Sequence, residues 1–151
     1  MTDAVFPTTG YLAWQFSQIV AGRLERALRA EDLTLAQHNA LQHAALTPGV
    51  SAAAIARRSG ITAQSMGAAV TQLVARGLLR REPHPTSRRS MRLYVTDEGH
   101  SAAARAASIA GRIEAETTAP LGTDDKDTIH RLLYHLVERL NPDALTVDRR
   151  S

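Results

Sequence analysis

The residues that break and restart helices are closely spaced in the middle of this chain, and this spacing restricts its fold more than any other feature. Ser51 opens a short helical segment that runs to Arg58, and Gly60 breaks it. Thr62 can cap a longer helix that runs to about Arg76. The pattern therefore predicts two helices joined by a tight turn.

A β-hairpin is expected directly after these two helices. Gly77 lies where a left-handed residue commonly ends a helix. Residues 78–81 have the character of a short strand, and Met91–Val95 alternates apolar with polar positions. Residues 83–87 include two prolines and are expected to lie outside regular structure.

Longer helices are predicted on both sides of this unit. We expect them over residues 8–30, 34–46, 97–118 and 123–140, the last three capped by Thr34, Thr96 and Thr123. The last helix has an apolar stripe with the helical period, formed by Ile129, Leu132, Leu133, Leu136, Val137 and Leu140. The fold class is therefore mainly α with a small β-hairpin.

Length and composition exclude several classes of protein. The 151 residues correspond to one domain, and 44% of them are hydrophobic, which is enough for a core. With no cysteine, thiol nucleophiles, disulfide scaffolds, Cys-ligated zinc and thiol-based sensing are excluded. No apolar run approaches the ~20 residues of a membrane span, and residues 1–10 do not have the pattern of a signal peptide. A cytoplasmic location is the expectation.

Charge is strongly segregated along the chain. Residues 33–96 contain eight arginines and a single acidic residue, Glu82, so their net charge is +7. The rest of the chain has ten basic and fourteen acidic residues, a net charge of −4. A basic segment between acidic flanks indicates a polyanionic partner, although a solvated basic surface is the simpler alternative.

Two helices, a tight turn and a hairpin form a winged helix-turn-helix, whose second helix is narrow enough to enter the major groove of DNA. The hairpin loop, with Arg88 and Arg89, is expected to reach a neighbouring groove or the backbone. Ordinary solvent exposure is the alternative for all these residues, and Arg76 could instead hold the wing. The expected DNA-binding residues are Ser51, Thr62, Gln64, Ser65, Ala68, Thr71, Gln72, Arg76, Arg88 and Arg89.

The same segment resembles the MarR family of bacterial transcriptional regulators. The matching motifs are Leu33-Thr34 with Gln37 and Leu41, Ala54-Ile55-Ala56, Ile61-Thr62-x-Gln64-Ser65, Leu73-Val74-x-Arg76-Gly77-Leu78-Leu79-x-Arg81, Arg88-Arg89 and Leu93-Tyr94-Val95-Thr96-x-x-Gly99. With the outer helices, the resemblance covers residues 10–140. The chain departs from the family at Ser87, where the wing usually has an aspartate that orients its arginine, here Arg89. This substitution puts the rigidity of the wing in doubt.

The resemblance implies a homodimer in which the first and the last two helices interlock. The apolar stripe of the last helix independently indicates that it needs a partner surface. We expect residues 1–32 and 97–151 to form the dimerisation region and residues 33–96 the DNA-binding region of one compact domain. Two-fold symmetry predicts a pseudo-palindromic operator with half-sites about 10 bp apart.

The family resemblance also implies a pocket for a small aromatic or phenolic ligand that releases DNA, with Trp14, His38 and His43 as its lining; core or dimer packing is the alternative for Trp14. A metal site is not expected. The histidine pairs are five residues apart, which separates them on a helix, and no His-Glu-x-x-His motif occurs. No cofactor is expected.

The sequence thus predicts a homodimeric, ligand-responsive DNA-binding repressor. The alternative is a winged-helix protein-interaction module that does not bind DNA, which only the altered wing motif supports. An enzyme is not expected, because residues 33–96 offer almost no carboxylate and no nucleophile cluster is evident.

Overall fold

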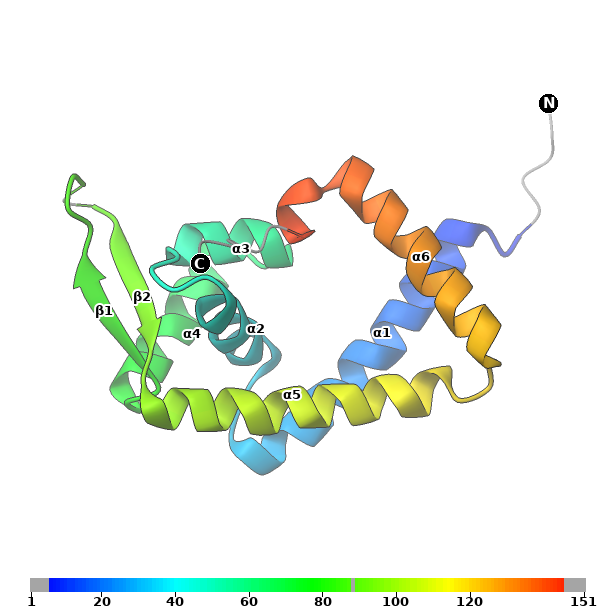
Figure 1. Cartoon of the computed structure of the whole chain (residues 1–151), viewed down its shortest axis with the longest axis horizontal. Helices are drawn as coiled ribbons and strands as arrows, with labels where there is room; N and C mark the ends of the chain where they lie inside the picture. Colours follow the sequence, from blue (N-terminus) through cyan, green and yellow to red (C-terminus); the bar gives the residue numbers. More distant parts are fainter. Residues whose placement is uncertain (1–5, 88, 146–151) are drawn as a thin grey trace.

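The computed structural model describes residues 6–87 and 89–145, and within them the chain is mainly helical with one antiparallel hairpin (Figure 1). The helix-turn-helix and the hairpin lie at one end, and the long helix α5 runs from the hairpin toward α6 at the other end. The elements in chain order are α1 (Thr9–Leu28), the 3-10 turn η1 (Arg29–Glu31), α2 (Leu35–Leu46), α3 (Ala52–Ser59), α4 (Ala63–Ala75), β1 (Leu79–Pro83), β2 (Met91–Val95), α5 (Asp97–Thr118), α6 (Thr123–Leu140) and the 3-10 turn η2 (Pro142–Leu145). The predicted fold class is confirmed.

Most predicted helix starts are confirmed by their capping hydrogen bonds. The hydroxyls of Thr34, Ser51, Thr62 and Thr96 each accept a hydrogen bond from a backbone N–H in the first turn of the helix that follows. The predicted cap of the last helix is wrong. Thr123 is its first helical residue, and Gly122 occupies the cap position without a side-chain bond.

The core lies between α2, α3, α4, the start of α5 and the hairpin. Leu41, Ile55, Met66, Leu73 and Leu93 are almost completely buried there. Val74 of α4 is half-buried and packs against the edge of this core. The helix-turn-helix and the wing therefore share one apolar core, which fixes their relative orientation.

The hairpin pairs Leu79 with Val95 at its base and Pro83 with Met91 at its far end. The expectation that Pro83 lies outside regular structure is wrong, because a proline is tolerated in an outer strand that has a free N–H side. On its other side β2 meets the α2–α3 turn. The N–H of Gly49 donates to the carbonyl of Leu93 at 2.8 Å, and Leu93 donates to Val50 at 3.0 Å.

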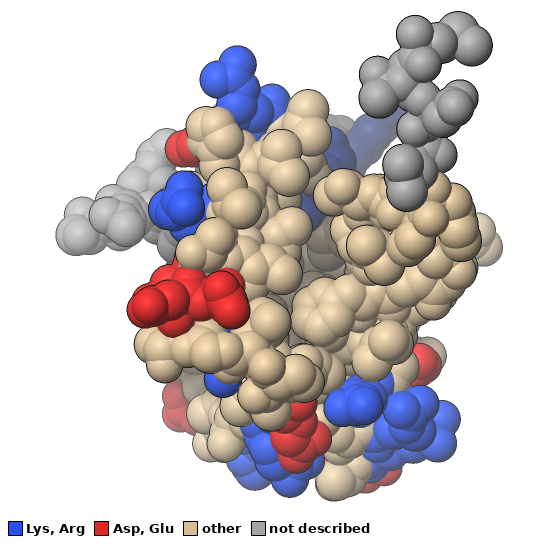
Figure 2. Space-filling view, turned by 90° about the vertical axis from the view of Figure 1, so that its right-hand side faces the viewer, with Lys and Arg blue, Asp and Glu red and all other residues tan. Residues whose placement is uncertain are grey.

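The end of the molecule opposite the hairpin exposes a large apolar surface. Figure 2 views this end and shows a broad area of uncharged side chains with charged groups mainly toward its margins. Within the described residues, α6 has no buried residue and packs extensively only against η2, which in turn contacts α3. The exposed apolar residues of α1 and α6 include Leu12, Trp14, Phe16, Ile19, Ile129, Leu132, Leu133, Tyr134, Leu136 and Leu140.

Candidate nucleic-acid interface

The first two turns of α4 expose short polar or small side chains on the face opposite the core. Met66, Ala69, Val70 and Leu73 form the buried face of this helix. Gln64, Ser65 and Ala68 are exposed, and within the described chain the side chains of Gln64 and Ser65 have no hydrogen-bond partner. These side chains are therefore exposed, and their contact with base edges stays a prediction.

The next polar residues of α4 are engaged by the protein itself. The hydroxyl of Thr71 accepts a 2.8 Å hydrogen bond from the guanidinium of Arg81 in β1. The side-chain oxygen of Gln72 accepts a 2.7 Å bond from the amide of Gln37, a buried residue of α2. These two residues connect α4 to the hairpin and to α2, a role that sequence spacing did not indicate.

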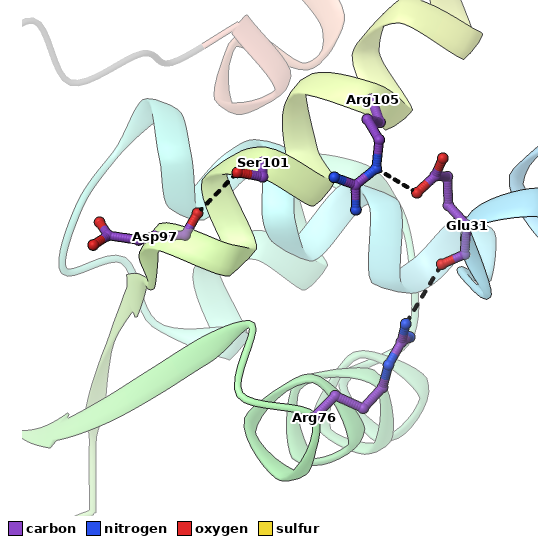
Figure 3. Close-up of polar contacts among 5 residues, drawn as sticks. All are labelled: Glu31, Arg76, Asp97, Ser101 and Arg105. Atoms are coloured by element: carbon purple, nitrogen blue, oxygen red, sulfur yellow. Dashed lines mark hydrogen bonds and ion pairs between the residues drawn. The ribbon is translucent and has the colours of Figure 1, made fainter.

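Arg76, at the end of α4, contacts the turn between α1 and α2 and not the wing. Its guanidinium donates to the backbone carbonyls of Asp32 at 2.6 Å and Glu31 at 3.4 Å. The carboxylate of Glu31 also accepts a 2.7 Å bond from Arg105 of α5, so two arginines from different helices meet at one turn (Figure 3). The suggestion that Arg76 holds the wing is wrong.

The tip of the wing is closed by a backbone hydrogen bond from His84 to Ser90 at 3.1 Å. Arg89 is exposed, and in the described part of the chain it has no ion pair or hydrogen bond to Ser87 or any other group. Arg88 lies outside the described residues. The serine that replaces the expected aspartate does not brace the arginine of this wing.

The charge of the helix-turn-helix and hairpin is mostly uncompensated. Glu82 pairs with Arg80, whose guanidinium also lies 4.5 Å from the centre of the Tyr94 ring. Arg58 donates to the neutral hydroxyl of Thr47 at 3.2 Å. The hydrogen-bond acceptors of Arg58 and Arg81 are neutral hydroxyls, so no negative charge offsets these two guanidinium groups. The helix-turn-helix and hairpin therefore form an electropositive region, as predicted from the sequence.

The three residues expected to line a ligand pocket are not brought together. A pocket of about 220 Å³ lies between α2 and α5, with His38, Gln42, Ala45, Leu46, Ala103 and Ala107 as its lining. Of the three expected residues, the pocket is lined by His38. His43 is on another face of α2, and the side chain of Trp14 on α1 is 58% exposed. Ala103 and Ala107 also line the pocket, but nothing in the sequence distinguishes them from the other alanines of α5.

The two histidines of α2 lie in an environment that disfavours their charged form. Burial lowers the pKa of His38, and the nearby His43 lowers it further. Burial and then the charge of Arg58 lower the pKa of His43.

No group of His, Asp and Glu that could hold a metal ion occurs among the described residues. Nor does any helix in residues 6–87 or 89–145 have the length and apolar character needed to cross a membrane.

A helix-turn-helix with an exposed polar second helix, followed by a hairpin anchored in the same core, defines a winged helix-turn-helix protein. Residues 31–90 match the model of the MarR family. Over 127 residues the chain is 28% identical to the HTH-type transcriptional repressor Rv2887 of Mycobacterium tuberculosis, covering 84% of this chain and 91% of the relative. These similarities support a winged-helix transcriptional regulator of the MarR family.

Solved structures agree with this assignment. The structure of Rv2887 in complex with salicylic acid has a TM-score of 0.75 at 26% identity, covering 90% of this chain and 99% of that one. The structure of the transcriptional repressor CouR bound to a 23-mer DNA duplex has a TM-score of 0.77 at 28% identity, covering 91% and 97%.

Proposed function

We propose that the protein is a homodimeric, sequence-specific DNA-binding repressor that responds to a small ligand. The observation that carries this proposal is the exposed face of α4 with Gln64, Ser65 and Ala68, set in a module whose arginines are mostly unpaired by acids. The relatives named as repressors support it, since both Rv2887 and CouR have been solved in complex with DNA. Because its partner would be chromosomal DNA, the proposal implies a binding function in the cytoplasm and no catalysis.

In the proposed complex, α4 enters the major groove and the wing contacts an adjacent groove or the backbone. Gln64, Ser65 and Ala68 would read bases, while Thr71 and Gln72 would act by holding α4 against its neighbours. Thr62 and Ser51, at the starts of two helices, would lie near phosphates. Arg88 and Arg89 belong to the wing contact, and Arg76 takes part by fixing the end of α4.

The second copy is proposed to cover the apolar surface of α1 and α6. Helices with this many large exposed side chains are unstable in water without a partner. Residues 1–32 and 97–151 would then form the dimerisation region, and residues 33–96 the DNA-binding region. A two-fold dimer predicts a pseudo-palindromic operator.

The effector site is proposed in the pocket between α2 and α5, next to His38. A pocket of about 220 Å³ with a mostly alanine and leucine lining suits a small aromatic ring, and the relative solved with salicylic acid supports this class of ligand. His38 would supply the polar contact. Trp14 and His43 do not line this pocket.

Salt titration of DNA binding tests the proposal. The affinity of the full-length protein for restriction fragments of its own genome is measured by gel shift at several salt concentrations. We expect specific retardation, with log affinity falling against log salt by about 0.9 for each phosphate neutralised. Failure to retard any fragment would instead favour a protein-interaction module, and a flat salt response would contradict the electrostatic account.

A further inference from the structure

A second, larger pocket lies on the winged-helix module. Its volume is about 500 Å³, and it opens between the α2–α3 turn, the first turns of α3 and the hairpin. Gly49 and Val50, which line the pocket, pair with the backbone of Leu93 and so join the turn to β2. The lining residues are Thr47, Pro48, Gly49, Val50, Ser51, Ala54, Arg58, His84, Arg92 and Tyr94.

The lining carries two guanidinium groups and no carboxylate. Arg58 and Arg92 are both half-buried, and neither forms an ion pair with any described acidic residue. Glu82, which lies opposite Arg92 in the hairpin register, is paired with Arg80. Two partly desolvated positive charges in one concave site attract an anion more strongly than the same charges on a flat surface.

Arg58 is held in place before any ligand arrives. Its Nη1 donates to the hydroxyl of Thr47 at 3.2 Å, and Thr47 is only 7% exposed. A guanidinium has five N–H donors, so this bond leaves donors free for a second acceptor. The fixed position lowers the entropic cost of binding an anion.

The other polar groups of the pocket are also able to donate. The oxygen of Ser51 accepts the capping bond of α3, which leaves its hydroxyl hydrogen free. Nδ1 of His84 accepts a 3.2 Å bond from the N–H of Thr86, which leaves Nε2 as the ring nitrogen that can donate. The hydroxyl of Tyr94 packs beside Gly49, where a β-carbon would lie 3.2 Å from it.

We propose that this pocket binds an oxyanion, a carboxylate or phosphate group, through Arg58 of α3 and Arg92 of β2. It is separate from the pocket between α2 and α5 and has the opposite character, polar and positively charged instead of apolar. The oxyanion belongs either to a free small molecule or to the DNA backbone. Because the two arginines come from the helix-turn-helix and from the wing, a bound oxyanion bridges these two parts.

Calorimetric titration of the full chain without DNA tests the free-molecule source. Inorganic phosphate and benzoate are the probes, at constant ionic strength set with potassium chloride. The variants are Arg58→Gln and Arg92→Gln, and Arg57→Gln is the matched control because Arg57 is adjacent, exposed and outside the lining. We expect each pocket variant to weaken binding of a probe at least about tenfold, as for loss of one charge-assisted hydrogen bond, while the control binds as the wild type does.

Salt titration of DNA binding tests the backbone source, and this arm rests on the function proposed above. If a DNA phosphate occupies the pocket, Arg58→Gln and Arg92→Gln each reduce the salt slope by about 0.9, and Arg112→Gln on α5 leaves it unchanged. A change in either arm supports the proposal and identifies the source. If neither probe binds through these arginines and the salt slope stays at its wild-type value, the proposal is overturned.

The two arms keep a failure of DNA binding distinguishable from a failure of this proposal. If the protein retards no DNA, the calorimetric titration alone still tests whether the pocket binds an oxyanion. Cooperative thermal unfolding of each variant checks that it folds. Should Arg58→Gln not fold, because Arg58 also supports Thr47, Arg92→Gln and the charge-preserving Arg58→Lys carry the test.

Discussion

Arg76 and Asp32, 44 residues apart in the chain, are joined by a 2.6 Å hydrogen bond from Nη1 of the guanidinium to the backbone carbonyl. Asp32 has a left-handed backbone with φ of 52°, which ends the turn after α1. The preceding residue, Glu31, holds Arg105 of α5 (Figure 3). One turn therefore contacts both the end of α4 and the long helix that leads to the apolar end of the molecule.

We expect Arg76→Ala to loosen α4. The loss of its hydrogen bonds should lower the free energy of unfolding by about 1 kcal/mol. DNA affinity should fall without a change in salt slope, because Arg76 acts by positioning the helix. Urea unfolding and gel shifts at several salt concentrations measure both quantities, with Arg112→Ala as the control. A salt slope reduced by about 0.9 would show a direct phosphate contact instead.

Base reading and backbone contact are separable by two substitutions. Gln64→Ala should change the ranking of operator variants, since each lost base contact alters discrimination by about 1–3 kcal/mol. Arg89→Ala should weaken binding to all sequences alike and reduce the salt slope by about 0.9. Competition binding with a panel of operator variants measures both effects, and Gln18→Ala on α1 is the control. Normal binding by Arg89→Ala would contradict the role of the wing.

Thr71→Ala is also expected to alter sequence preference, but through a different cause. It removes the acceptor of the Arg81 bond, so it changes the contact between α4 and β1 as well as the helix surface. The variant Arg81→Gln, assayed on the same panel, separates these two causes.

Of the two glycines in α5, Gly99 is the one where a side chain meets close neighbours. A β-carbon there would overlap the carbonyl oxygen of Leu78 and lie 2.7 Å from Cγ1 of Val95. Gly99→Ala should therefore destabilise the fold by about 2 kcal/mol or more. Gly111→Ala on the same helix meets nothing within 4 Å and should stabilise by about 0.5–1 kcal/mol. Thermal and urea unfolding of the two variants test this opposite sign.

The free energy of unfolding should fall as the pH is lowered below 6.5, the ordinary pKa of histidine. The pKa values of His38 and His43 are lowered by burial first, so the unfolded chain binds protons at these residues before the folded chain does. Stability from this source is present above 6.5 and is lost as the pH falls toward the lowered values. Urea unfolding across this range tests the sign. Replacing both histidines with glutamine should flatten the dependence, whereas His100→Gln on the surface of α5 should not.

The proposed dimer depends on the apolar stripe of α6. Leu136 is 51% exposed in the single chain, so Leu136→Glu would bury a charge if a second copy covers it. We expect this variant to be monomeric or to aggregate in analytical ultracentrifugation. Arg131→Glu, on the opposite side of the same helix, should remain dimeric. A dimeric Leu136→Glu variant would place the interface elsewhere.

Local signals in the sequence were sufficient for most elements. The start of α5 matches the prediction because Thr96 caps it, and Gly77 has the left-handed backbone predicted for the residue that follows α4. The last helix lacks such a signal: it begins at Thr123, and the preceding cap residue, Gly122, makes no side-chain capping bond. Pro83 was misplaced because the rule against proline in strands weakens at an outer strand.

Long-range contacts were the part that could not be predicted. Nothing near Arg76 in the sequence indicates Asp32, and nothing near Gln72 indicates Gln37. Of the residues expected at the ligand pocket, His38 lines the pocket between α2 and α5 and Trp14 and His43 do not, because only packing decides which helix face turns toward it. The charge of residues 33–96 was predicted, but its concentration at Arg58 and Arg92 depends on the pairing of the α2–α3 turn with β2.

The pairing of β2 with the α2–α3 turn fixes the base of the wing and leaves its tip unsupported by that turn. The backbone pairing with the α2–α3 turn ends at Leu93, opposite Arg81, while the two strands continue together as far as Pro83 and Met91. Each further residue adds about 3.3 Å of overhang before the tip that carries Arg89. A small rotation at the base of the wing, where Gly49 is hydrogen-bonded to Leu93, therefore becomes a larger displacement at the tip. The stiffness of this base determines how precisely Arg89 is positioned.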